Sequence, residues 1–173
     1  MKKRAVIALF IVMFIPALCS AKEWKDVDNL GMTALEVAIR DGKTADFDTF
    51  VAQGIDPNFH GKANFPVFAW AAMFENPDFV KKLFELGADI NAVDDKGNKP
   101  IKYAVTSPRA PMQTVEFLLK SGTTLSKEEF EALRGEVEGA MRLTKEPNML
   151  PSEKASIEKI AEKFEVVKKH FKY

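Results

Sequence analysis

The chain has 173 residues with 25 basic and 25 acidic side chains, so its formal net charge at pH 7 is zero. A balanced charge excludes the electrostatic attraction on which binding to nucleic acid or to an anionic membrane surface depends. The length is enough for one domain with a real core. A single cysteine, Cys19, allows no internal disulfide, so packing alone must hold the fold together.

The start of the chain, residues 1–21, has the composition of a secretory signal peptide. The basic segment Lys2–Arg4 precedes an apolar run over 5–15, and small residues lead up to Ala21. The run is shorter than the roughly 20 residues of a membrane-spanning helix. Cleavage after Ala21 would leave 22 basic against 25 acidic residues, a net charge of −3. We expect a periplasmic protein, and a lipoprotein anchored through Cys19 is the alternative.

The chain then repeats itself with a period of 33 residues. The segment "GIDPN" at Gly54–Asn58 recurs as "GADIN" at Gly87–Asn91. Upstream, "GMTALEVAIRDG" at Gly31–Gly42 has counterparts at Asn64–Glu75 and Gly97–Ser107, each 33 residues further on. Apolar residues at helical spacing followed by glycine, Asp and Asn predict two short helices and a tight turn in each unit.

The third unit contains a small insertion. Its second helix, Val115–Gly122, lies 35 residues after the matching segment Val80–Gly87, and the two extra residues fall within Ser107–Pro111. Each second helix ends at a glycine that can cap the last turn in the left-handed conformation. These glycines are Gly54, Gly87 and Gly122.

The period and the turn resemble those of the ankyrin repeat. The family pattern is Thr-Pro-Leu-His followed by Ala-Ala, then a leucine-rich helix, then Gly-Ala-Asp-x-Asn. The resemblance covers about Asp28 to Gly122. Matching residues are Thr33, Leu35 and Ala38 in the first copy, Ala71, Ala72 and Gly87–Asn91 in the second, and Pro100, Ala104 and Phe117–Leu119 in the third.

The resemblance implies an all-α solenoid of about three helix–turn–helix repeats, at about residues 28–60, 61–93 and 94–125. A β-hairpin finger is expected near His60–Phe65 and another near Val93–Asn98. We also expect fewer stabilising polar contacts than in consensus repeats, because the threonine and histidine positions of the family hold other residues. The departures are Pro66 and Lys99 at the threonine position, and Glu36, Ala69 and Lys102 at the histidine position.

Two helices are expected to cap the solenoid over residues 126–173. Ser126 with Glu129 three residues later forms a capping box that opens a helix to about Leu143. A last helix begins after Ser152, with a polar face of lysine and glutamate that suits the end of a solenoid. A helix lying on a membrane surface is the alternative. The residues of its apolar face are Ile157, Ile160, Ala161, Phe164, Val167 and Phe171.

The residue pattern predicts neither a catalytic site nor a metal or cofactor site. His60 and His170 lack metal-ligand spacing, and no glycine-rich phosphate loop or nucleophile elbow is present. The acidic segments Asp26–Asp28 and Val93–Asp95 could hold a cation, but at such turns we interpret them as solvated finger residues. We therefore do not expect an enzyme.

A repeat solenoid offers an extended concave surface, and in ankyrin proteins the variable residues there bind the partner. Phe65, Met73 and Phe74 are large apolar residues at positions expected to face solvent, and they predict the centre of an interface. Packing in the core is the alternative for the same residues. The predicted partner-binding residues are Leu30, Met32, Arg40, Phe59, Lys62, Phe65, Met73, Phe74, Asp95, Lys96 and Asn98.

These features together predict a periplasmic protein-binding module. By analogy with small exported ankyrin proteins of bacteria, we expect an immunity protein that neutralises a secreted effector such as a lipase or cell-wall hydrolase. A periplasmic scaffold or stress-related adaptor for an endogenous protein is the alternative, and an enzyme ranks third. The expected partner is another protein, with no nucleic acid and no membrane insertion after signal cleavage. We expect a monomer when the protein is free.

Overall fold

A computed structural model describes residues 23–172 of the chain. The expected signal peptide, including Cys19, lies outside the described residues. The described part is all-helical, with one 3₁₀ turn at Lys62–Asn64 and no β-strand. Its helices are α1 (Ala34–Arg40), α2 (Thr44–Ala52), α3 (Val67–Ala72), α4 (Pro77–Glu85), α5 (Pro100–Thr106), α6 (Met112–Lys120), α7 (Lys127–Leu143) and α8 (Pro151–His170).

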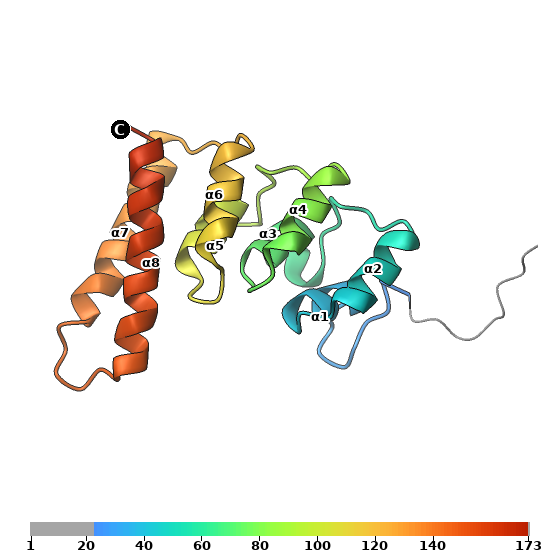
Figure 1. The fold of residues 1–173 in the computed structure, drawn as a ribbon, viewed down its shortest axis with the longest axis horizontal. Helices are drawn as coiled ribbons and strands as arrows, with labels where there is room; N and C mark the ends of the chain where they lie inside the picture. The colour runs from blue at the N-terminus through green and yellow to red at the C-terminus, as the bar shows by residue number, and fades with distance from the viewer. Residues whose placement is uncertain (1–22, 173) are drawn as a thin grey trace, which may run out of the picture.

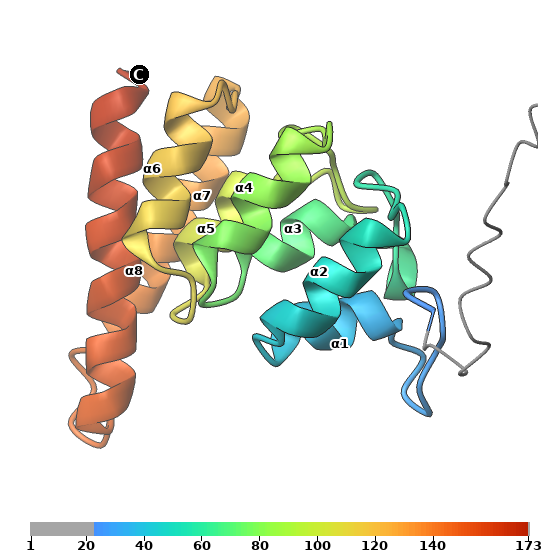
Figure 2. The same ribbon diagram turned by 45° about the vertical axis from the view of Figure 1, so that its right-hand side comes forward.

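The first six helices form three antiparallel pairs that stand side by side, as Figure 1 shows. Helices α1, α3 and α5 are neighbours in an inner row, and α2, α4 and α6 pack against them as the outer row. Helix α8 packs against α5, α6 and α7 and closes the end of the array (Figure 2). The three helix–turn–helix units expected from the 33-residue period are thus confirmed.

Asparagine side chains join each turn to the next one. Asn58 Nδ2 donates to the Gly87 carbonyl at 3.1 Å, and Asn58 Oδ1 accepts from the Asp89 amide at 2.7 Å. Asn91 makes the same two bonds to the turn that follows α6, at 3.5 and 2.9 Å. This explains why the turn is so rich in polar residues, since it caps a helix and also bonds to the next unit. The capping glycines have the expected positive φ angles, at +80° for Gly54, +96° for Gly87 and +97° for Gly122.

Each unit begins with a projecting finger: finger 1 (27–33), finger 2 (60–66) and finger 3 (93–99). The hairpins are shorter than expected. Instead of paired strands, fingers 1 and 2 contain single antiparallel bridges, and each finger closes through a backbone bond across a four-residue turn. In each finger a backbone N–H donates to the carbonyl four residues further on: Asp28 to Met32 at 2.9 Å, Gly61 to Phe65 at 2.9 Å and Asp94 to Asn98 at 3.1 Å.

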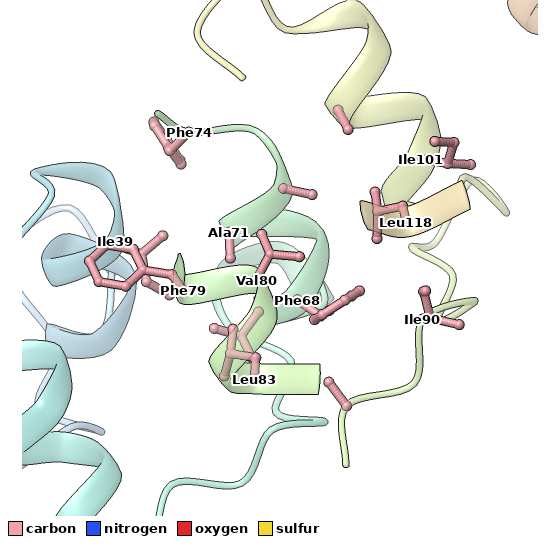
Figure 3. Packing of buried hydrophobic residues seen from close by; sticks show 14 of the residues in the cluster. Ile39, Phe68, Ala71, Phe74, Phe79, Val80, Leu83, Ile90, Ile101 and Leu118 are labelled. Carbon is pink, nitrogen blue, oxygen red and sulfur yellow. The ribbon is translucent and has the colours of Figure 1, made fainter. Parts of the chain in front are cut away.

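Aromatic pairs connect the outer helices of adjacent units. The rings of Phe47 and Phe79 lie 4.4 Å apart between α2 and α4, and those of Phe84 and Phe117 lie 5.5 Å apart between α4 and α6. Figure 3 shows Phe79 and Leu83 in the cluster that α4 shares with α3 and α6. Burying a side chain fully, as for Phe47 and Phe79, contributes about 1.5–3 kcal/mol. The core therefore runs continuously from unit to unit.

The C-terminal helices follow the repeats without a fourth finger. The N-cap of α5, Lys99, comes twelve residues after Gly87, but the N-cap of α7, Ser126, comes only four residues after Gly122. The predicted capping box is confirmed, with Ser126 and Glu129 bonded reciprocally at 2.6 and 3.2 Å. No helix among residues 23–172 is long and apolar enough to span a bilayer.

One residue expected on the polar outer face of α8 is instead buried. Lys163 is 2% exposed, and its Nζ donates to the carbonyls of Ala104 at 2.9 Å, Ala110 at 3.1 Å and Ser107. Burial and the nearby charge of Lys159 lower the pKa of Lys163 to about 8. Its three N–H donors match two carbonyls at the end of α5 and one in the connection to α6.

The insertion in the third unit explains this arrangement. Pro108 and Pro111 stand four residues after Ala104 and Ser107, and proline has no N–H to close a helical bond. The carbonyls at the end of α5 therefore lack their usual donors, and buried carbonyls need partners. Lys163 supplies them from α8, which fixes the cap to the third unit.

Candidate protein-binding surface

Finger 2 is held by a buried carboxylate from the preceding unit. Glu36 is 1% exposed, and its Oε2 accepts from the amide and hydroxyl of Thr33, each at 2.8 Å. Its Oε1 accepts from the Lys62 amide at 2.9 Å. A Cβ atom added at Gly61 would lie 2.2 Å from Oε1, so the close approach requires glycine there. Glu36 stands where the family has histidine, and it supplies polar contacts of its own. At this position the expected loss of polar contacts is therefore not found.

Fingers 1 and 3 use aspartates of their own. The carboxylates of Asp28 and Asp94 each accept the backbone N–H groups two and four residues further on, at 2.8–2.9 Å. The hydrogen bond from the Met32 amide lowers the pKa of Asp28. Burial alone would raise the pKa of Asp94, but hydrogen bonds from Tyr103 and Asn98 outweigh it and lower that pKa. Within residues 23–172, no group of three or more His, Cys, Asp or Glu side chains could hold a metal ion.

The fingers are also bonded to one another. Lys62 Nζ of finger 2 donates to the Leu30 carbonyl of finger 1 at 2.5 Å. Asn64 Nδ2 of finger 2 donates to Asp95 Oδ1 of finger 3 at 2.7 Å. Finger 2 thus has side-chain contacts with both of its neighbours, so the three tips form one connected edge.

Three half-buried aromatic residues lie at the base of this edge, and we call them the aromatic strip: Phe65, Trp70 and Tyr103. The Phe65 ring lies edge-on to Trp70 at 6.0 Å and to Tyr103 at 4.9 Å. Trp70 Nε1 donates to the Glu36 carbonyl at 2.9 Å, and the Tyr103 hydroxyl donates to Asp94. Because both polar atoms already have partners, the strip has mainly ring surface to offer to a partner.

The expectation that Phe74 faces solvent is wrong. Phe74 is 8% exposed, because the Arg109 guanidinium lies 4.5 Å above its ring. Arg109 is held there by Glu75 at 3.3 Å and by the Arg40 carbonyl at 3.2 Å. Arg109 comes from the two-residue insertion of the third unit, which therefore covers an apolar residue of the second.

Met32 is likewise buried, at 7% exposure, with Arg40 Nη1 lying 3.4 Å from its sulfur. The other predicted residues keep exposed surface. Those on the open surface are Leu30 (64% exposed), Lys62, Asp95 and Lys96, and those half-buried are Arg40, Phe59, Phe65, Met73 and Asn98.

The sequence reasoning missed four surface residues. Trp70 and Tyr103 occupy the same position in successive units, 33 residues apart, and this shared aromatic character could have identified them. Val27 and Val93 likewise share a finger position and are 65% and 48% exposed. Trp70 and Tyr103 extend the apolar surface around Phe65, and the two valines add exposed apolar side chains on fingers 1 and 3.

Comparison with known proteins agrees with this architecture. Residues 68–119 match the family model described as ankyrin repeats (many copies). A similar curated protein is the inactive serine/threonine-protein kinase TEX14 of Bos taurus, 38% identical over 84 residues. The match covers 47% of this chain and 5% of that protein, so the chain spans only a small part of this relative. Ankyrin repeats are protein–protein interaction modules and carry no catalytic activity of their own. With its 33-residue period, paired helices and projecting fingers, the chain contains ankyrin repeats.

Proposed function

We propose that this chain binds another protein through the surface formed by its fingers and its inner helices. The observation that carries this proposal is the aromatic strip. Phe65, Trp70 and Tyr103 stay partly exposed, although the residues beside them on α3 and α5 are buried in the core. Large aromatic side chains with saturated polar atoms are typical anchors of protein interfaces.

The residues around the strip fit an interface with an apolar centre and a polar rim. Leu30 and Val27 are 64% and 65% exposed, so finger 1 presents two large apolar side chains on its surface. Lys62, Asp95 and Lys96 add charges of both signs at the finger tips. Mixed charges at a rim contribute more to specificity and association rate than to affinity.

The site of action proposed here is the periplasm, because residues 1–21 have the composition of a secretory signal peptide. Small exported ankyrin proteins of bacteria, which this chain resembles, are often encoded beside secreted toxins. On that analogy the partner is a secreted effector, such as a lipase or cell-wall hydrolase, and the chain is its immunity protein. A scaffold for an endogenous periplasmic protein uses the same surface and differs only in the partner.

Capture of the partner from periplasmic extract, followed by mass spectrometry, tests the proposal. We expect Phe65→Ala and Leu30→Asp to weaken the captured partner's binding, Phe65→Ala by about thirtyfold, which corresponds to roughly 2 kcal/mol. Leu143→Asp is a matched control, since Leu143 is 54% exposed on α7, away from the fingers. Equal binding by Phe65→Ala and wild type would contradict the proposed surface. Protection of cells that express the captured protein would distinguish immunity from scaffolding.

A further inference from the structure

The place where a fourth finger would stand is occupied by a cleft. Fingers 2 and 3 each follow a capping glycine, but the connection from the third one to α7 is eight residues shorter than that from Gly87 to α5 and contains no finger. A cleft of about 260 Å³ lies there between finger 3 and the first turns of α7. It is smaller than the roughly 300–1,000 Å³ of typical small-molecule sites.

The floor of the cleft is apolar and its walls are charged. Leu125 and Leu133 form the buried floor, at 7% and 2% exposure, and the exposed Ala132 lies beside them. Lys96, Lys99 and Lys102 line the wall formed by finger 3 and α5, and Glu128 and Glu129 line the α7 wall.

Most of these charges are already compensated. Lys99 pairs with Glu129 at 2.9 Å and Lys102 pairs with Glu136 at 3.0 Å. Glu128 bonds to its own amide and to Ser126, which lowers its pKa. Lys96 forms no ion pair with any residue between 23 and 172. Within the same range Glu128 also has no lysine partner, but it lies in the first turn of α7, where the helix dipole favours an acidic side chain. Lys96 is therefore the lysine of the cleft without an ion pair, and it is complementary to a carboxylate.

Contacts between the existing fingers indicate where that carboxylate would come from. Turn positions are counted from Asp28, Gly61 and Asp94 as the first. Lys62, at the second position of finger 2, reaches the backbone of Leu30, at the third position of finger 1.

Lys96 is the third-position residue of finger 3, so it would face the second position of any turn placed next in the row. An acid at the second position already bonds to the preceding finger, since Asp95 accepts from Asn64, at the fourth position of finger 2.

We propose that the protein partner inserts a tight turn into this cleft as a fourth finger, with a carboxylate at the second turn position bonded to Lys96 and a small apolar residue on Ala132. The cleft lies at the end of the finger row, so the turn would continue the surface described above. This inference rests on the proposed function for its partner, but its chemistry can be tested without that partner.

The test uses a cyclic peptide carrying Val93–Asn98, the turn of finger 3, as the probe. Titrated into the ¹⁵N-labelled protein, it should shift amide signals of Lys96, Gly97 and Ala132. Lys96→Glu and Ala132→Phe should each weaken the peptide by about tenfold, because they reverse the charge and fill the cleft. Lys82→Glu and Ala155→Phe, at exposed positions on α4 and α8, are the matched controls.

A second peptide, with lysine in place of its second turn aspartate, should bind about tenfold more weakly. Shifts located elsewhere, or equal affinity for Ala132→Phe and Ala155→Phe, would overturn the inference. Phe65→Ala should bind the peptide as the wild type does, because the aromatic strip is not part of the cleft. The captured partner distinguishes the two proposals. If Phe65→Ala loses the partner while Ala132→Phe and Lys96→Glu still bind it, the insertion of a fourth finger is overturned and the proposed function stands.

Discussion

Replacing Gly61 by alanine should destabilise the protein far more than a surface glycine replacement normally does. The added Cβ would lie 2.2, 2.4 and 2.7 Å from Oε1, Cδ and Oε2 of Glu36, so that carboxylate would have to move. Gly61 has a φ of −86°, outside the positive range that favours glycine, so this prediction is built on the collision with Glu36.

The size of the effect follows from the bonds that Glu36 would lose. Its carboxylate is 1% exposed and accepts from the Thr33 amide, the Thr33 hydroxyl and the Lys62 amide. Hydrogen bonds to charged groups contribute about 1.5–3 kcal/mol each. Losing one or two of them predicts a loss of about 1.5–6 kcal/mol, a large share of the roughly 5–15 kcal/mol that stabilises a domain.

Urea unfolding of Gly61→Ala measures this loss. Gly135→Ala is the control, because Gly135 lies on an exposed part of α7 with nothing within 4 Å of its added Cβ. That change should stabilise the protein by about 1 kcal/mol through helix propensity. In a Glu36→Ala background the collision is absent, so Gly61→Ala should then cost little. A loss below about 0.5 kcal/mol, or additive effects in the double variant, would refute this reasoning.

Three further predictions concern burial, pH and backbone strain. Arg109→Ala should expose the Phe74 ring and cost about 1 kcal/mol in urea unfolding, whereas Arg109→Lys should restore part of the loss. Stability should rise by about 1–2 kcal/mol from pH 8 to 9.5, because the unfolded chain still binds the proton that folded Lys163, with its pKa of about 8, has lost. A Lys163→Met variant should lack this slope, and a slope unchanged by that substitution would contradict the assignment. Ala63→Gly should raise the melting temperature, because Ala63 has a φ of 58° that costs alanine about 1 kcal/mol, and an unchanged melting temperature would count against that strain.

The sequence predicted the parts of the fold that depend on local pattern. The 33-residue period located the three helix pairs, and the Ser126 capping box located the start of α7, since both depend on residues close in the chain. The burial of Phe74 was not predictable in this way. It depends on Arg109, which lies 35 residues later and reaches Phe74 only because of the insertion.

The same limit applies to Lys163. Helical periodicity placed it on a polar face, but its environment is set by carbonyls 53 to 59 residues earlier in the chain. The candidate surface was recovered only in part for a related reason. Leu30 and Phe65 lie at finger positions that are expected to face solvent, whereas Trp70 and Tyr103 lie on inner helices, and their place beside Phe65 is set by contacts between units.

The bond from Arg109 to the Arg40 carbonyl changes how the array can deform. In a solenoid each unit normally touches only its neighbours, so strain spreads one interface at a time. Arg109 reaches back 69 residues, from the third unit to the first, at 3.2 Å. It acts as a clasp on the loop side of the array, where units one and three cannot separate without breaking it. Among the contacts described, side-chain bonds at the finger tips join only neighbouring fingers. Bending should therefore separate the finger tips from one another while the loop side of the array stays closed.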